Sequence, residues 1–235
     1  MNKAKIRIVK IGQQRNEVLF DRLKKYKSDI FTVDIFQVGI PNPDYGWGYS
    51  FKALHKVLAD NANSKYDLCI GFLDYEIEDN LYGICLNENN SLFVLSFYQG
   101  LEFLQGENID PLNYILGAIY RFTTEYLLGD RLDHDETRGC LFDMMGYKRD
   151  IVISARKPSI CQECETKIKL KSRAIPDDYL ILLQRELKKI KKQNYYLIAD
   201  FIKGHPYLSL FLAFVSGVIA NIISSGIYDL LKGAF

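Results

Sequence analysis

The chain is poor in histidine and in net charge. It has 235 residues with only three histidines, and 30 Lys and Arg against 29 Asp and Glu leave a net charge of +1. No two of His55, His134 and His205 lie one helical turn apart, which excludes a zinc enzyme of the His-x-x-x-His type. The near-zero net charge also argues against nucleic-acid binding by overall positive charge.

The N-terminus lacks the continuous apolar segment of a secretion signal. Residues 1–9 alternate charged and apolar side chains, which predicts a strand instead. Without a secretion signal, the five cysteines indicate a reducing compartment rather than a disulfide framework. We therefore expect this part of the chain to lie in the cytoplasm.

The C-terminal part contains a long segment without charge. The 23 residues from Pro206 to Tyr228 include no Asp, Glu, Lys, Arg or His, and as a helix they would extend roughly 34 Å, enough to cross a membrane. A buried core helix is the alternative, but it would carry a charged stripe that this segment lacks. Lys and Arg are concentrated before the segment, so the positive-inside rule places the N-terminal domain in the cytoplasm. We predict a single-pass protein of the inner (cytoplasmic) membrane.

Hydrophobic periodicity predicts alternating strands and helices in the first 172 residues. The expected strands are 5–11, 30–40, 67–73, 81–86 and 91–97, and the expected helices are 14–27, 51–59 and 113–128. This order indicates a mixed α/β domain over residues 1–172. A Lys-rich helical stalk is predicted over residues 173–203, with its helix starting at about Asp177, and a transmembrane segment over residues 204–235.

One histidine and three cysteines follow the last expected helix of this domain. His134, Cys140 and the C-x-x-C pair Cys161 and Cys164 supply the four nitrogen and sulfur ligands of a closed tetrahedral zinc site. Structurally idle thiols are the alternative. A thioredoxin-like use of the C-x-x-C pair is less consistent, because the pair is not expected to open a helix after a βαβ strand.

The sequence around these residues resembles the archaemetzincin family of zinc metallopeptidases, over roughly residues 1–170. The family pattern is a long helix carrying H-E-x-x-H-x-x-G-x-x-H-C, then a second Cys followed shortly by Met, then a C-x-x-C. In this comparison Glu125 takes the position of the family's general base and His134 that of its third zinc-binding histidine. Cys140, Cys161 and Cys164 take the positions of three of the four cysteines that hold a second, structural zinc.

The departures from the family pattern concern the catalytic zinc. Thr124 and Leu128 stand where the first two zinc-binding histidines are expected, and Asp135 replaces the first structural cysteine. A catalytic zinc needs three protein ligands, so the resemblance implies a zincin-like fold that is not an enzyme. It also implies a retained structural zinc, with His134 or Asp135 as the fourth ligand and His134 favoured.

Small and polar residues recur every three or four positions in the apolar segment. Small faces allow close packing of helices in lipid, and an Asn in hydrocarbon needs a hydrogen-bonding partner. A dimer held by small residues is one interpretation, and a homo-oligomer whose polar face lines a pore or ion channel is the one we favour. The expected pore-lining residues are Gly217, Asn221, Ser224, Ser225 and Asp229.

These features predict an oligomeric membrane effector gated by its cytoplasmic domain. The arrangement is similar to the transmembrane effectors of bacterial antiphage defence by abortive infection, of the CBASS or Hailong type. That similarity implies a nucleotide or oligonucleotide regulator and a partner protein from the same operon. We expect Arg121 and Arg131 to contact the phosphates of such a ligand, although ordinary surface or ion-pairing arginines are the alternative. A membrane-anchored adaptor without pore activity and a membrane-tethered metallopeptidase are the competing functions.

Overall fold

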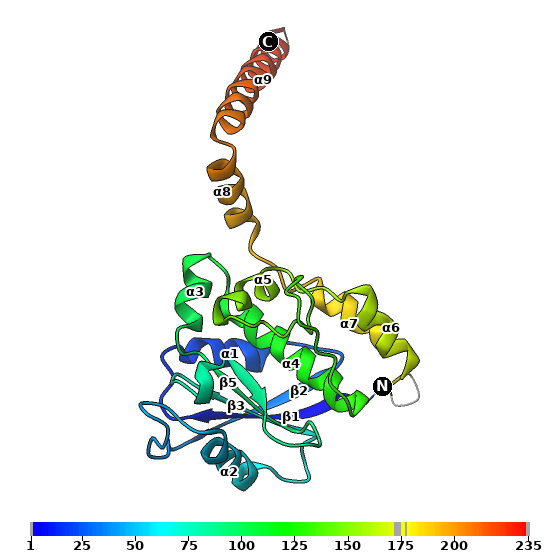
Figure 1. Cartoon of the computed structure of the whole chain (residues 1–235). Helices are drawn as coiled ribbons and strands as arrows, with labels where there is room; N and C mark the ends of the chain where they lie inside the picture. Colours follow the sequence, from blue (N-terminus) through cyan, green and yellow to red (C-terminus); the bar gives the residue numbers. More distant parts are fainter. Residues whose placement is uncertain (1, 172–174, 177, 234–235) are drawn as a thin grey trace. The chain divides into compact units, whose positions relative to one another are not determined.

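The computed structural model describes residues 2–171, 175–176 and 178–233, with side chains described up to Ser225 (Figure 1). The chain forms two compact units, Met1–Lys191 and Lys192–Phe235. The first unit contains a five-stranded sheet and the helices that cover it. The second contains two helices.

The sheet has the strand order β2-β1-β3-β5-β4. Strands β1 (Ala4–Ile11), β2 (Phe31–Val38), β3 (Leu68–Leu73) and β5 (Leu92–Ser96) run parallel, and β4 (Gly83–Cys85) pairs antiparallel with β5 at one edge. Every residue of β3 and β5 is buried, as expected for parallel strands covered on both faces. The five predicted strands and the mixed α/β class are confirmed.

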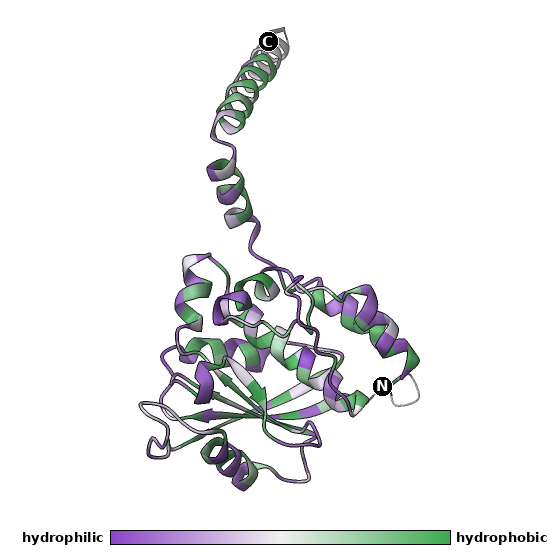
Figure 2. Cartoon of the chain, in the orientation of Figure 1, coloured by the Kyte–Doolittle hydropathy of each residue, from purple (hydrophilic) through white to green (hydrophobic). Residues whose placement is uncertain are grey.

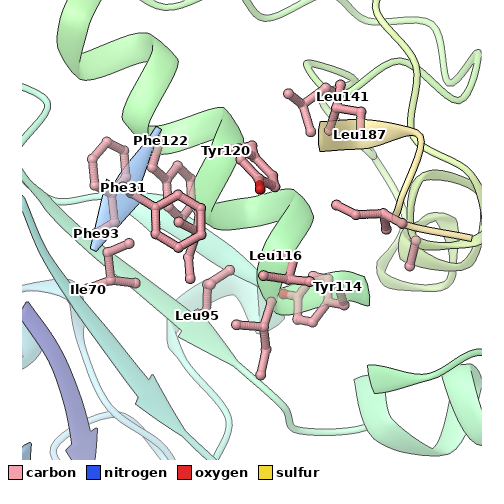
Figure 3. Close-up of a cluster of buried hydrophobic side chains, with 14 of the residues drawn as sticks. Phe31, Ile70, Phe93, Leu95, Tyr114, Leu116, Tyr120, Phe122, Leu141 and Leu187 are labelled. Carbon is pink, nitrogen blue, oxygen red and sulfur yellow. The ribbon is translucent and has the colours of Figure 1, made fainter. Parts of the chain in front are cut away.

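Helices pack on both faces of the sheet (Figure 1). Helices α1 (Glu17–Lys25) and α4 (Pro111–Leu128) lie on one face, and α2 (Phe51–Asn61) lies on the other. The side chains between α4 and the sheet are largely aromatic and aliphatic, and the ring of Phe93 stacks on that of Phe122 with centroids 4.0 Å apart (Figure 3). The three predicted helices are therefore confirmed, with ends shifted by a few residues.

Helix α4 carries Arg121 and Glu125, and its ends are fixed by the sequence. The carboxylate of Asp110 accepts a hydrogen bond from the backbone N–H of Leu112, and Pro111 occupies the first turn. At the other end Gly129 takes a left-handed conformation with φ 65°, which closes the helix at little cost because glycine has no Cβ.

Four further helices of the first unit were not predicted as such. They are α3 (Gly100–Gly106), α5 (Ile151–Arg156), α6 (Gln162–Leu170) and α7 (Tyr179–Leu187). All four have nine residues or fewer, so periodicity gives only a weak signal for them, and α7 falls within the longer stalk helix predicted from about Asp177.

The predicted stalk helix from about Asp177 to Lys203 is not continuous. The structure has α7 and a separate helix α8 (Asn194–Gly204), and residues 188–193 lie outside both. Helix α7 belongs to the first unit because Tyr179, Leu183 and Leu187 are buried in its core. The first unit thus extends to Lys191, whereas the predicted boundary at residue 172 and the predicted start at Asp177 fall outside the described residues.

Helix α9 (Pro206–Gly233) contains the predicted membrane span. Its segment Pro206–Ser225 has a mean hydropathy of 2.0, and no part of it is buried within the chain (Figure 2). The helix has the length and the composition needed to cross a membrane. The side chain of Asp229, which we predicted to line a pore, lies outside the described part.

Candidate functional site

The four predicted zinc ligands come from the segment after α4 and from the start of α6. His134 forms an isolated β-bridge with Asp143, and Cys140 forms one with Ser159. Cys161 is the residue that immediately precedes α6, and Cys164 lies in its first turn. These two bridges help to bring together ligands that are up to 30 residues apart in the sequence.

The ligand atoms of His134, Cys140, Cys161 and Cys164 all lie within 4.8 Å of one another. The Cys161 Sγ atom is 3.6 Å from His134 Nε2. Sulfur ligands about 2.3 Å from a tetrahedral zinc lie about 3.8 Å apart, so the cluster needs little adjustment to hold the ion. It contains His134 and not Asp135, whose side chain is exposed.

The groups around the cluster orient the histidine. His134 Nδ1 is 3.1 Å from the carbonyl oxygen of Glu136 and 3.4 Å from Asp143 Oδ1, so Nε2 faces the cysteines. Asp143 is fully buried, and its Oδ2 accepts hydrogen bonds from three consecutive backbone N–H groups, those of residues 138–140. Burial raises the pKa of Asp143. A carboxylate beside the far nitrogen of a ligating histidine is the usual means of fixing its tautomer and ring orientation.

The cysteines are not equivalent. The hydrogen bond between the two sulfur atoms lowers the pKa of Cys140, which accepts it, and raises the pKa of Cys164, which donates it. One thiolate is thus stabilised before metal binding, and the other thiols lose their protons when a metal binds. Bound zinc would cross-link the segment after α4 to the start of α6 through all four ligands.

The C-x-x-C pair opens helix α6, which the sequence had not led us to expect. Cys161 and Cys164 share the N-terminal turn, where the helix dipole favours thiolates. The third cysteine and the histidine beside the pair support metal binding rather than disulfide exchange.

A cavity of about 340 Å³ lies next to the cluster. Its walls are β4 with the residues before it, one side of α4, and the segment after α4 that carries His134. Among its lining side chains are Tyr82, Asn113, Arg121, Glu125, Arg131 and Asp133.

Arg121 joins the cavity to the zinc-ligand cluster. Its guanidinium forms ion pairs with Glu125, at 3.1 Å, and with Asp133, and donates a hydrogen bond of 2.7 Å to the backbone oxygen of Asp143. These partners take three of the five N–H donors of the guanidinium, so the contact of Arg121 with phosphate stays a prediction. Arg131 also lines the cavity and has no ion pair among the described residues.

Glu125 is almost fully buried, with 3% exposure, and lies in the cavity wall. Burial raises the pKa of this carboxyl group, and Arg121 opposes the shift. Thr124 and Leu128, the two positions that the family resemblance assigns to zinc histidines, do not line this cavity. Thr124 Oγ1 is 2.7 Å from the hydroxyl oxygen of Tyr179 in α7, and Leu128 is part of the hydrophobic core.

Sequence reasoning missed three residues of this site. Asp143 orients His134, Asp133 pairs with Arg121, and Tyr179 contacts Thr124. Only Asp143 had a possible signal, because it is an acidic residue three positions after a candidate metal ligand.

The chain was compared with known proteins. No protein-family model and no curated protein matches the sequence. The archaemetzincin of Methanopyrus kandleri has a similar structure, with a TM-score of 0.52 and 16% identity over 73% of this chain and 96% of that protein. A zinc-dependent peptidase of Methanocorpusculum labreanum gives a TM-score of 0.46 and 12% identity, over 69% of this chain and 99% of that protein. The archaemetzincin of Archaeoglobus fulgidus, complexed with malonate, gives 0.43 and 18%, with the same coverage.

These findings contradict our prediction that the chain is not an enzyme. The solved structure with a TM-score above 0.5 is an archaemetzincin, and the His/Cys₃ cluster that could bind zinc is present in this chain. Missing histidines at two positions are therefore not sufficient to assign the chain to the non-enzymes. The chain has an archaemetzincin-like α/β fold with a cluster suited to zinc, followed by one apolar C-terminal helix.

Proposed function

We propose that the chain is an oligomeric membrane effector in which α9 helices of several copies associate and form a pore. The archaemetzincin-like domain would control the association. The observation that carries this proposal is Asn221, because it places a side-chain amide in the middle of an apolar, exposed helix.

The side-chain amide of Asn221 needs a hydrogen-bonding partner if α9 lies in a membrane. Among the described side chains, Ser216 donates its hydroxyl hydrogen to the carbonyl of Ala213 within the helix, whereas Asn221 has no such bond. An unpaired amide in hydrocarbon costs free energy, which an amide of a neighbouring copy or water in a pore would recover. At 100° per residue, Gly217 and Ser224 lie on the same face as Asn221.

The lysines before α9 and the folded domain that precedes it support the cytoplasmic location and the ligand control in this proposal. Lysines precede the span at positions 188, 189, 191, 192 and 203, which supports a cytoplasmic first unit by the positive-inside rule. A folded domain on one membrane helix is an arrangement that suits a ligand-controlled effector of antiphage defence. Arg131 is the basic side chain of the cavity that would meet an anionic regulator such as a nucleotide.

Dye and ion flux from liposomes containing the full chain tests the pore. We expect leakage by the wild-type chain, and its loss in Asn221→Leu, together with a smaller oligomer in mass photometry. Ile219→Leu is the matched control, because residue 219 lies on the opposite face of α9 and the change conserves volume. A monomeric wild-type chain, or equal leakage by both variants, would refute the proposal.

A membrane-tethered peptidase is the second candidate, and Glu125 favours it. This carboxyl group lies in the cavity wall beside the segment that carries the zinc ligands, burial raises its pKa, and a carboxyl group in a cavity is a common general acid or base. Four protein ligands would leave a zinc in the cluster no open position, so any hydrolysis would use the groups of the cavity.

Mass spectrometry of peptide libraries incubated with the zinc-loaded full chain tests this second candidate. Cleavage that disappears in Glu125→Gln but persists in the surface variant Glu163→Gln would support peptidase activity. Leakage and cleavage are measured separately, so either function can fail without the other.

A further inference from the structure

A second cavity lies at the carboxyl edge of the parallel strands, apart from the zinc-ligand cluster. Its volume is about 530 Å³, and its walls are the segments that follow β1, β3 and β5 together with the loop between β2 and α2. None of its lining residues belongs to the zinc-ligand cluster or to the first cavity. We call it the edge cavity.

Two buried acceptor atoms in its wall have no hydrogen-bond partner among the residues that the structure describes. They are Asp74 Oδ1 and Gln14 Oε1. The orientation of Gln14 is fixed, because its amide NH₂ donates to the carbonyl oxygens of Ile11 and Phe72, both at 3.1 Å, and only Oε1 remains. The side chain of Asp74 is 5% exposed, and its other oxygen accepts the backbone N–H of Arg15. Buried acceptors without donors are rare in folded proteins and call for a donor that binds there.

Aromatic rings surround the same cavity. Trp47, Tyr75 and Tyr98 line it, and Trp47 is 93% exposed. The loop that carries Trp47 is firmly held, since the carboxylate of Asp44 accepts hydrogen bonds from both the backbone N–H and the hydroxyl of Ser50. Gly48 packs so closely on the backbone of residue 76 that a Cβ would lie 2.2 Å from its carbonyl oxygen. A firmly held loop therefore presents an almost fully exposed indole ring at this cavity.

The charge of the edge cavity is negative. Three carboxylates line it, those of Asp74, Glu76 and Glu102, against the single guanidinium of Arg15. That guanidinium forms its close ion pair with Glu102, at 2.8 Å, and is 3.8 Å from Asp74 Oδ2, so it does not satisfy Asp74 Oδ1. Lys148 lies outside, 5.1 Å from the centre of the Tyr98 ring.

We propose that the edge cavity binds an organic cation, a primary ammonium or a guanidinium group. Its N–H groups would donate to Asp74 Oδ1 and Gln14 Oε1, and the Trp47 ring would cover its apolar part. Aromatic faces and carboxylates together are the surroundings that such cations prefer, and only a donor-rich group satisfies both free acceptors. The source is either a free amine or an arginine or lysine side chain of a peptide.

The fluorescence of Trp47 reports binding directly, because it is the only tryptophan of the chain. The full chain in lipid nanodiscs is titrated with agmatine, with N-acetyl-arginine methylamide, and with the uncharged analogue N-acetyl-citrulline methylamide. We expect a saturable change with a guanidinium compound and binding at least about tenfold weaker for citrulline, since a hydrogen bond to a charged group is lost. Tighter binding of agmatine than of the arginine compound indicates a free amine, and the reverse indicates a peptide.

Variants test the residues. Asp74→Asn should weaken binding at least about tenfold, whereas Asp34→Asn, the same change at a distant exposed site on β2, should leave it unchanged. If Asp74→Asn does not fold, as judged by circular dichroism, Glu102→Gln on the rim takes its place and should weaken binding about threefold. The absence of a saturable change with either guanidinium compound, or equal binding of the citrulline compound, would overturn the proposal.

Discussion

Replacing Glu186 with alanine should destabilise the first unit strongly. Glu186 lies in α7, beyond the predicted domain boundary, and is fully buried. Its carboxylate accepts hydrogen bonds from the hydroxyl of Ser28 at 2.5 Å, from the backbone N–H of Asp29 at 2.6 Å, and from the hydroxyl of Tyr120. It therefore connects α7 to α4 and to the turn before β2.

The magnitude follows from the donors that alanine would leave behind. Hydrogen bonds to a charged group contribute about 1.5–3 kcal/mol each, so three of them set an upper range of about 5–9 kcal/mol. Tyr120 keeps a second partner, because its hydroxyl is 3.3 Å from that of Tyr26, whereas the Ser28 hydroxyl and the Asp29 N–H lose the acceptor that Glu186 supplies. We therefore expect a loss of about 3–5 kcal/mol. Glu186→Gln keeps one acceptor oxygen and should lose about 1–3 kcal/mol.

Thermal unfolding of the full chain, followed by near-ultraviolet circular dichroism, measures this loss. For a unit of this size, 3–5 kcal/mol corresponds to a fall in Tm of roughly 6–20 °C. Glu163→Gln in α6 is the control, because its ion pair with Lys167 is exposed and such pairs contribute about 0–1 kcal/mol. A fall in Tm of less than about 3 °C for Glu186→Ala would refute the assignment of α7 to the core.

Three further predictions concern the metal, the boundary and pH. The wild-type chain should contain about one zinc per copy by elemental mass spectrometry. Cys161→Ser should lose this zinc, because the variant lacks one of the four ligands. A full zinc content in the variant would contradict the assignment of Cys161 as a ligand. A chain ending at Lys191 should fold and melt cooperatively, whereas one ending at Lys171 should not, because it lacks α7; circular dichroism distinguishes them. Hydrogen bonds from the hydroxyl and N–H of Ser50 lower the pKa of Asp44. The Asp44 carboxylate therefore stabilises the Trp47 loop fully at pH values above the ordinary aspartate pKa of about 3.9. This stabilisation is lost as the pH falls through the lowered pKa of Asp44. Trp47 emission should therefore change below that pH, and Asp44→Asn should abolish the transition.

Most of the sheet could be predicted because burial imposes a simple pattern. β3 and β5 are short apolar runs, and α4 repeats apolar residues at helical spacing with a Pro at its start and a Gly after its end. The break between α7 and α8 could not be predicted in the same way. Residues 188–193 are mostly Lys and contain neither Pro nor Gly, so local propensity favours a continuous helix. Burial of the apolar side of α7 in the first unit overrides that propensity.

The site was predictable as far as it depends on ligand type and spacing. Four nitrogen and sulfur ligands within about 30 residues indicated zinc, and the structure brings them together. The partners of Arg121 were not predictable, because Glu125, Asp133 and the backbone of Asp143 come together only through the fold of the segment after α4. An arginine in a cavity wall suggests an anionic ligand, and only the three-dimensional contacts show that three of its five N–H donors already have partners.

The contacts of Asp143 couple the zinc-ligand cluster to the first cavity. Its side chain lies beside His134 Nδ1, and its backbone oxygen accepts a hydrogen bond from Arg121, which in turn pairs with Glu125 in the cavity wall. Asp133, the residue before His134, pairs with the same arginine. Zinc bound at His134 would therefore fix the position of two groups that hold Arg121, and loss of the metal should change the shape and the charge of the cavity. A ligand-controlled effector and a peptidase would both depend on zinc for this reason, even with no contact between ligand and metal.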